Sequence, residues 1–359
     1  MVLYLRIIKK NTFMKNINIT LLLIITMLLS ACKTATIYND VLIPAQVTLP
    51  QHIQKIGVLN RSLPAKGEVW KNVVEGIFTG ESIMADREGS YNVCKGLVFK
   101  VNNNPRFVAR LLENEDIRGT GTKKFPAPIS WEVISQLCMI YDVDAIVSLE
   151  TFDSDISRKS SVKDVKKRIK DEDVVVPEYT ENVDVRVNAG WRIYDPTNKT
   201  VSENVFTDSK GWKGVGATAQ EALNKIPPKR NIINESGFFC GEMMGVRISP
   251  NWVRVPRYYY VSGDDNLKRA KYFVKVNNWK EAVAIWTKLA RSSDPKIAGR
   301  ACHNMAVAAE TEGYLNVALD WANKAYKNYY LKKERNYINT LNKRLREEQL
   351  LREQLPSEK

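Results

Sequence analysis

The sequence predicts an α+β fold in two parts, a three-layer mixed sheet with helices followed by an all-α helical repeat. Between residues 53 and 149, short apolar segments alternate with helix-like spacing, which indicates parallel strands joined by crossover helices. From Val183 to Ile193, apolar and polar residues alternate strictly, which indicates a half-exposed strand. After residue 263, matching residues recur at a constant offset, which indicates a repeat.

The parallel part of the sheet is expected at the start of a mixed-sheet domain that spans residues 53–261. The apolar spacing from Val69 to Phe78, and again from Val93 to Val98, predicts helix before the second strand. Ser130 is a candidate N-cap, because its hydroxyl can accept a hydrogen bond from the first turn of a helix that ends near Tyr141. The expected parallel strands cover residues 56–59, 107–112 and 144–149.

The same domain is expected to end in antiparallel strands. Residues 195–199 have the composition of a turn, so residues 200–207 can return as the hairpin partner of the alternating strand. Residues 211–216 predict a glycine-rich turn, and they lack the spaced lysine and hydroxyl of a phosphate-binding loop. Two further helices lead to a strand over residues 252–261. Residues 153–180, dense in both charges, predict a solvated excursion or mobile loop.

The amino terminus has the pattern of a lipoprotein signal. An apolar run too short to span a bilayer ends in the sequence Leu29-Ser30-Ala31-Cys32. Residues 1–31 are therefore expected to be removed as a signal peptide, with Met14 as an alternative start. Cys32 would become the lipid-carrying first residue, and the polar residues 32–52 would form a lipidated tether. The residue after Cys32 is Lys33, whereas an aspartate at this position is associated with retention in the inner membrane. The outer membrane is therefore favoured, and either of its two faces is possible.

The charge of the chain is strongly positive. It carries 54 lysines and arginines against 40 aspartates and glutamates, a formal net charge of +14. A lysine-rich solvated surface accounts for this excess, and attraction to anionic envelope polymers or lipids is the alternative. Nucleic acid is not expected as a partner, because the densest basic segment lacks interleaved aromatic residues and contains many acids.

Cysteine and histidine are too scarce to predict a metal site. No two cysteines have the spacing of a metal-binding pair and the chain has 2 histidines, so neither metal nor cofactor is expected. Cys138 and Cys302 fall within helical patterns, which favours free thiols, whereas pairing of Cys94 and Cys240 is left open. The chain lacks a nucleophile elbow and a distinctive carboxylate pair, so no catalytic residue or small-molecule ligand is predicted.

The carboxy-terminal part, residues 263–359, contains two similar units. Each predicts two amphipathic helices joined by a tight turn, with small residues where the helices cross. This order of small and aromatic residues resembles the tetratricopeptide repeat, and Pro295 stands where that family places a proline between units. A further helix over residues 330–354 would cap the second unit. The matching pairs are Trp279 with Leu315, Ala282 with Ala318 and Leu289 with Ala325.

The resemblance to the tetratricopeptide repeat implies a concave surface that binds peptides. The candidate residues of this protein-binding face are Phe273, Trp279, Trp286 and Tyr314. Because a solenoid usually needs about three repeats, the alternative is that two repeats only brace the first domain. A capping helix that lies on a membrane surface is a further alternative.

A second resemblance covers residues 30–260. The lipoprotein signal, residues 55–60 and residues 191–196 resemble segments of uncharacterised Bacteroidota lipoproteins with a domain of unknown function. More distantly, this part resembles the mixed sheet of curli-secretion and penicillin-binding-protein-activator lipoproteins. The resemblance implies no catalytic residues.

These observations predict a non-catalytic lipoprotein of the cell envelope that acts as a scaffold and holds a protein partner in an assembly. One alternative is a subunit of an oligomeric secretion channel of the curli-secretion type. Such a subunit needs an exposed, alternating apolar segment, and residues 153–180 are too charged to serve as one. The other alternative is an enzyme that acts on cell-wall glycan.

Overall fold

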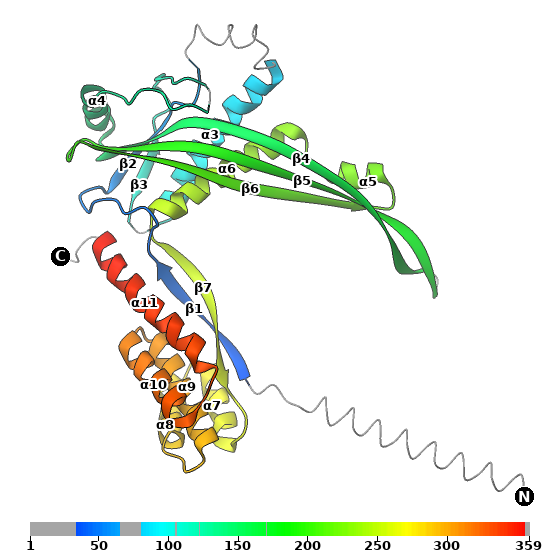
Figure 1. Ribbon diagram of the computed structural model, residues 1–359, viewed down its shortest axis with the longest axis vertical. Coiled ribbons are helices and arrows are strands. Elements are labelled where there is room, and N and C mark those ends of the chain that lie inside the picture. Colours follow the sequence, from blue (N-terminus) through cyan, green and yellow to red (C-terminus); the bar gives the residue numbers. More distant parts are fainter. Residues whose placement is uncertain (1–33, 65–79, 105, 122, 170, 356–359) are drawn as a thin grey trace, which may run out of the picture. The chain divides into compact units, whose positions relative to one another are not determined.

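The computed structural model describes residues 34–64, 80–104, 106–121, 123–169 and 171–355. The chain divides into two compact units. Of the described residues, those from 43 to 251 and from 350 to 355 form the sheet unit, and those from 34 to 42 and from 252 to 349 form the helical unit. The expected α+β class is confirmed, because a mixed sheet with helices is followed by a run of helices (Figure 1). The helix expected from Val69 to Phe78 and the signal peptide expected over residues 1–31 lie outside the described residues.

The sheet unit is built on five strands in the order β3-β2-β4-β5-β6. β2 pairs in parallel with β3 and with β4, and the two following pairs, β4·β5 and β5·β6, are antiparallel. The expected change from parallel to antiparallel pairing is therefore confirmed. The strands are β2 (Lys55–Asn60), β3 (Val108–Leu111), β4 (Ala145–Ile169), β5 (Glu172–Asp195) and β6 (Thr200–Gly216).

Helices cover both faces of this sheet, which gives the three expected layers. On one face, α3 (Gly80–Asn102) and α6 (Lys229–Ile248) share a core with strand residues such as Val58 and Trp191. On the other face, α4 (Trp131–Tyr141) packs around Leu59 and Ile146. The Ser130 hydroxyl accepts a hydrogen bond from the main chain of Val133, so the predicted N-cap is confirmed. A short helix, α5 (Ala219–Asn224), follows β6.

The close packing of α3 against α6 depends on glycine. A Cβ atom on Gly241 would collide with the carbonyl oxygen of Val93, and one on Gly96 would collide with the carbonyl oxygen of Phe238. Gly237, Gly241 and Gly245 recur at every fourth residue of α6 and so share one helix face. The two backbones therefore approach more closely than any residue with a side chain would allow.

The charged segment at residues 153–180 is not a loop but a long β-hairpin, so that expectation is wrong. β4 and β5 pair without interruption from Phe152 and Ala189 to the tip, where Ile169 lies opposite Glu172. Opposite charges hold the register where no apolar face exists: Lys163 lies across from Glu178, and the Lys167 ammonium is 3.5 Å from the Glu178 carboxylate.

The glycine-rich stretch at residues 211–216 is also strand rather than turn. These residues form the end of β6, and Gly211 to Gly216 lie opposite Asp184 to Tyr179. The hairpin extends beyond this third strand, so residues 163–169 and 172–178 form a two-stranded ribbon.

The helical unit contains two helix pairs and most of a fifth helix. Ala270, Ala282, Ala318 and Ala325 are fully buried where the helices cross, which agrees with the expected small positions. The Asp294 side chain caps α9, with Pro295 in its first turn. The helices are α7 (Asp265–Lys275), α8 (Trp279–Leu289), α9 (Pro295–Thr311), α10 (Leu315–Tyr329) and α11 (Glu334–Gln354).

A two-stranded sheet of β1 (Thr34–Ile43) and β7 (Asn251–Tyr260) packs on these helices. The lipidated tether expected over residues 32–52 is therefore wrong from Thr34 onward. Ile37 contributes to the helical core and Val41 is buried, whereas Tyr38 between them is exposed, so β1 has the period-two pattern of a strand packed on one face. β7 belongs to the helical unit from Trp252 onward rather than to the mixed sheet.

The four cysteines in the described residues are buried free thiols. This is the state expected for Cys138 and Cys302, and Cys94 and Cys240 share it. Burial raises the pKa of the Cys138 and Cys302 thiols to about 11, and it raises the pKa of the other two as well. The thiols therefore stay protonated near neutral pH and act as small apolar side chains.

Candidate functional site

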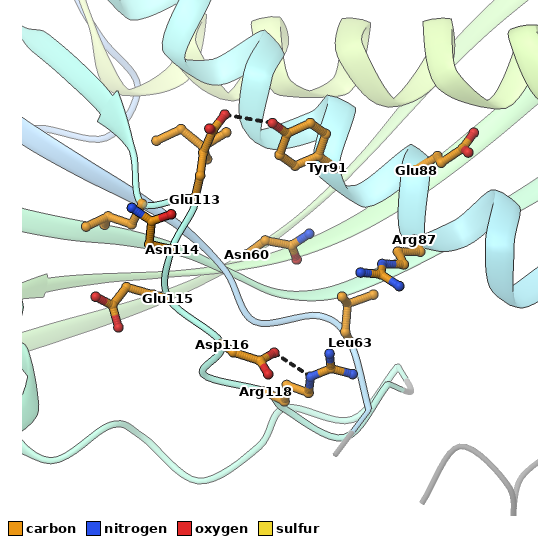
Figure 2. A pocket seen from close by; sticks show the side chains of 12 residues that line it. Asn60, Leu63, Arg87, Glu88, Tyr91, Glu113, Asn114, Glu115, Asp116 and Arg118 are labelled. Carbon is orange, nitrogen blue, oxygen red and sulfur yellow. Dashed lines mark hydrogen bonds and ion pairs between the residues drawn. The ribbon is translucent and has the colours of Figure 1, made fainter. Parts of the chain in front are cut away.

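The sheet unit has a crevice at the carboxyl ends of its parallel strands. β2 ends at Asn60 and β3 at Leu111, and the chain leaves these neighbouring strands toward opposite faces, to α3 and α4 respectively. Ligands of open α/β sheets commonly bind at such a point. A cavity of about 620 Å³ opens here, lined by α3 and by the loop that follows β3 (Figure 2).

Four carboxylates line this crevice, together with the basic side chains of Arg87 and Arg118. Each carboxylate has a protein donor: two of these pairs join the loop after β3 to α3 and α4, one lies within the loop, and one joins α3 to α6. The donor–acceptor pairs are Tyr91 Oη to Glu113 at 2.7 Å, Tyr141 Oη to Glu115 at 2.8 Å, Arg118 Nε to Asp116 at 2.6 Å and Arg230 Nε to Glu88 at 2.6 Å.

The protonation of these groups follows their contacts. The hydrogen bond to Glu113 raises the pKa of Tyr91, and the hydrogen bonds from Arg230 and Asn234 lower the pKa of Glu88. In the part of the chain that the structure describes, no group of three His, Cys, Asp or Glu side chains could hold a metal ion. The crevice is thus a polar hollow whose acids are already engaged.

A buried ionic cluster lies in the same sheet, where the β4·β5 register shifts between Leu149 and Thr151. Glu150, at this irregularity, is fully buried and lies 3.0 Å from Arg61 Nη1 and 3.8 Å from Arg192 Nη1. Tyr194 donates its hydroxyl to the same carboxylate at 3.1 Å. Burial raises the pKa of Glu150 even though the two guanidinium groups oppose this shift.

This cluster positions a loop rather than a ligand. Arg61 and Arg192 donate to the main-chain carbonyls of Ala127 and Pro126, and the Tyr194 hydroxyl accepts from the main chain of Ile129. The loop that precedes α4 is therefore fastened to the sheet by groups that depend on one carboxylate.

In the helical unit, one face of α9 holds β7 through main-chain contacts. The Asn304 side chain accepts from the Tyr260 amide and donates to the Tyr260 carbonyl, both at 2.7 Å. His303 Nε2 is 2.9 Å from the Tyr258 carbonyl, and Arg300 donates to the Ser262 carbonyl at 2.6 Å. The helical repeat therefore already contains an extended segment of its own chain.

Buried charges reinforce this arrangement. Glu310 of α9 accepts two hydrogen bonds from Arg257 of β7, at 2.7 and 2.8 Å, and further ones from Tyr337 and Arg344 of α11. His303 Nδ1 lies 2.8 Å from Glu334 at the start of α11. Burial and the Glu310 carboxylate raise the pKa of Tyr337. One face of α9 thus joins β7 to α11.

The expected protein-binding residues do not form one accessible face. Trp286 is fully buried in the helical core, so its assignment to a binding face is wrong. Phe273 and Trp279 are partly buried against the same core. Tyr314 is 65% exposed. The proposed lipidation site, Cys32, lies outside the described residues.

Two groups of residues were missed that the sequence could have indicated. Arg300, His303 and Asn304 occur at helical spacing and share one polar stripe of an otherwise apolar helix, which is a pattern for contact with a polar backbone. The fourth-residue spacing of glycines in α6 likewise indicates close helix packing.

Among the described helices, none is both long and apolar enough to cross a membrane. Comparison with curated proteins finds no match. Residues 268–343 match a family model described as Domain of unknown function (DUF6340). Residues 53–260 match a second one, and they make up more than half of the chain. On this match, the chain belongs to the family described as Domain of unknown function (DUF8603).

Proposed function

We propose that this chain is a non-catalytic, lipid-anchored scaffold of the cell envelope, held by Cys32 and bound to a protein partner through its helical unit. The observation that carries the proposal is the set of tyrosines exposed on that unit. Tyr272, Tyr314 and Tyr330 are 63%, 65% and 82% exposed. Tyrosine is enriched at protein interfaces, because its rigid ring buries a large area and its hydroxyl remains hydrogen-bonded.

The charge distribution supports a distinct role for the helical unit. Residues 252–349 contain nearly twice as many basic as acidic residues, whereas residues 43–251 contain about as many of each. The excess charge of the folded chain is therefore concentrated on the unit that carries the exposed tyrosines. Such a surface attracts an acidic partner over about a Debye length.

The anchor is tested by labelling cells with radioactive palmitate. We expect the wild-type chain to incorporate label and to fractionate with membranes, and Cys32→Ser to lose both properties. Cys138→Ser is the matched control, because this buried thiol is unavailable for acylation and its loss should change neither result. Full labelling of Cys32→Ser would refute the anchor.

The partner surface is tested by placing a photo-crosslinking amino acid at Tyr314 in cells. We expect a crosslinked product of discrete mass that weakens when Tyr272 and Tyr330 are changed to alanine. The control places the same amino acid at Ile140, which is 68% exposed on α4 of the sheet unit. Identical products from Tyr314 and Ile140, or no product from Tyr314, would contradict the proposal.

The alternative is a subunit of a secretion channel. The structure contains a long hairpin of the kind such a subunit needs, but this hairpin is not apolar. Lys163 and Lys166 are exposed and, with opposite parity along β4, point to opposite faces of the ribbon. Both faces of the hairpin therefore carry charge, which is why we favour the scaffold.

A further inference from the structure

The free edges of the strands differ in how they are protected against pairing with another chain. An edge strand exposes unpaired amide and carbonyl groups, and lysine, arginine or proline at the edge discourages strand addition. Beyond its pairing with β2, one side of β4 is open, and this stretch is rich in exposed lysine and arginine from Arg158 to Arg168. These basic side chains thus discourage strand addition at the long edge of the sheet unit.

The edge of β7 is closed by different means. Main-chain groups of Tyr258 and Tyr260 contact the side chains of His303 and Asn304, so α9 occupies the position that a further strand would take. Pro256 on the same strand has no amide hydrogen to donate. Both devices leave β7 unable to accept another strand.

β1 has none of these protections. Among the described residues its main chain pairs with β7 alone, and its ten residues include no lysine, arginine or proline. Most are β-branched or apolar, which favours extended pairing. Its single charged residue, Asp40, is neutralised by Arg254, whose Nε and Nη2 atoms donate to its carboxylate at 2.9 and 3.0 Å.

We infer that the outer edge of β1 is an interface between two copies of this chain, which pair through β1 as a two-fold antiparallel extension of the β1·β7 sheet. A second copy is the fitting occupant because the strand complements itself. Its only charge is paired within its own chain, so two copies meet without like-charge repulsion. The exposed face, with Thr36 and with Tyr38 at 65%, supplies cross-strand pairs of the same kind from each copy. This interface does not depend on the lipid anchor.

The pairing is tested by single-cysteine scanning in the full chain, produced in cells. Thr34, Thr36 and Tyr38 are changed to cysteine one at a time, oxidised and examined on non-reducing gels. Residues directly opposite in such a pair have Cβ atoms about 5 Å apart, close to disulfide range. We expect a disulfide-linked dimer that peaks sharply at one of the three positions, because only residues at the two-fold axis meet their own counterparts.

Tyr314→Cys is the matched control, since this tyrosine is also 65% exposed but lies on the helices. The best position on β1 should give about tenfold more dimer than Tyr314→Cys, because a bound pair raises the local thiol concentration. A flat profile with yields equal to the control, no dimer at any position, or crosslinks only to a chain of different mass would each overturn the inference.

A second variant does not rely on disulfides. Tyr38→Lys places like charges across the two-fold axis on an exposed face, where it should leave the fold intact. We expect the detergent-solubilised protein to sediment as a dimer in the wild type and as a monomer in Tyr38→Lys, with unchanged circular dichroism. A wild type that sediments as a monomer at all concentrations would also overturn the inference.

Discussion

Gly241→Ala is expected to destabilise the sheet unit by about 3 kcal/mol, the upper part of the range for overpacked cores. The added Cβ would collide with the carbonyl oxygen of Val93, a main-chain atom of α3 that cannot rotate away. Helix propensity alone predicts the opposite sign, since alanine is favoured over glycine by about 1 kcal/mol in a helix interior. A lower free energy of unfolding for Gly241→Ala would therefore indicate that close packing dominates, and a higher one would indicate that helix propensity dominates.

The measurement is the urea dependence of hydrogen exchange at β5 amides, which report on the sheet unit itself. Asn231→Ala is the control, because this residue is exposed on the same helix and its replacement should shift stability by no more than about 0.5 kcal/mol. If Gly241→Ala proved as stable as this control, the close approach of α3 and α6 would be wrong.

Glu150→Ala should have a comparable or larger effect, a loss of about 3–5 kcal/mol. Removal of this carboxylate leaves Arg61 and Arg192 buried without their shared counter-ion. The loop before α4 would lose its fastening as well, because both arginines and Tyr194 hold its main chain. We therefore expect faster hydrogen exchange at Ile129 than in the wild type, in addition to the global change.

Glu203→Ala provides the comparison for this cluster. Glu203 also accepts hydrogen bonds from Arg192, but its side chain is 51% exposed, so its loss should cost no more than about 1 kcal/mol. Equal losses from the two variants would mean that burial of Glu150 is not what makes the cluster costly to disrupt.

The elements that could be predicted are those that bury apolar residues in a regular pattern. The parallel strands bury apolar residues on both faces, whereas the helix capped by Ser130 and the alternating strand from Val183 to Ile193 bury mainly one face. The distal hairpin could not be predicted in this way. Beyond the end of β6 most of its residues are exposed on both faces, so the hydrophobic period that identifies a strand disappears.

Which strand packs on α9 could not be predicted, for a different reason. The polar stripe of α9 indicates contact with a backbone, but Asn304 and His303 contact main-chain atoms of Tyr260 and Tyr258, so the side chains of β7 do not identify it as the partner. β1 was missed because its partner strand lies more than two hundred residues further along the chain and its pattern is short. Aromatic residues assigned to a binding face, such as Trp286, instead fill the core between helices.

The early start of β1 limits how far the folded chain could stray from a bilayer. With an acyl group on Cys32, only two peptide units separate the lipidated residue from Thr34, and they reach about 7 Å when fully extended. The first strand would then lie close to the lipid headgroups, and the helical unit that contains it would stay near the membrane surface.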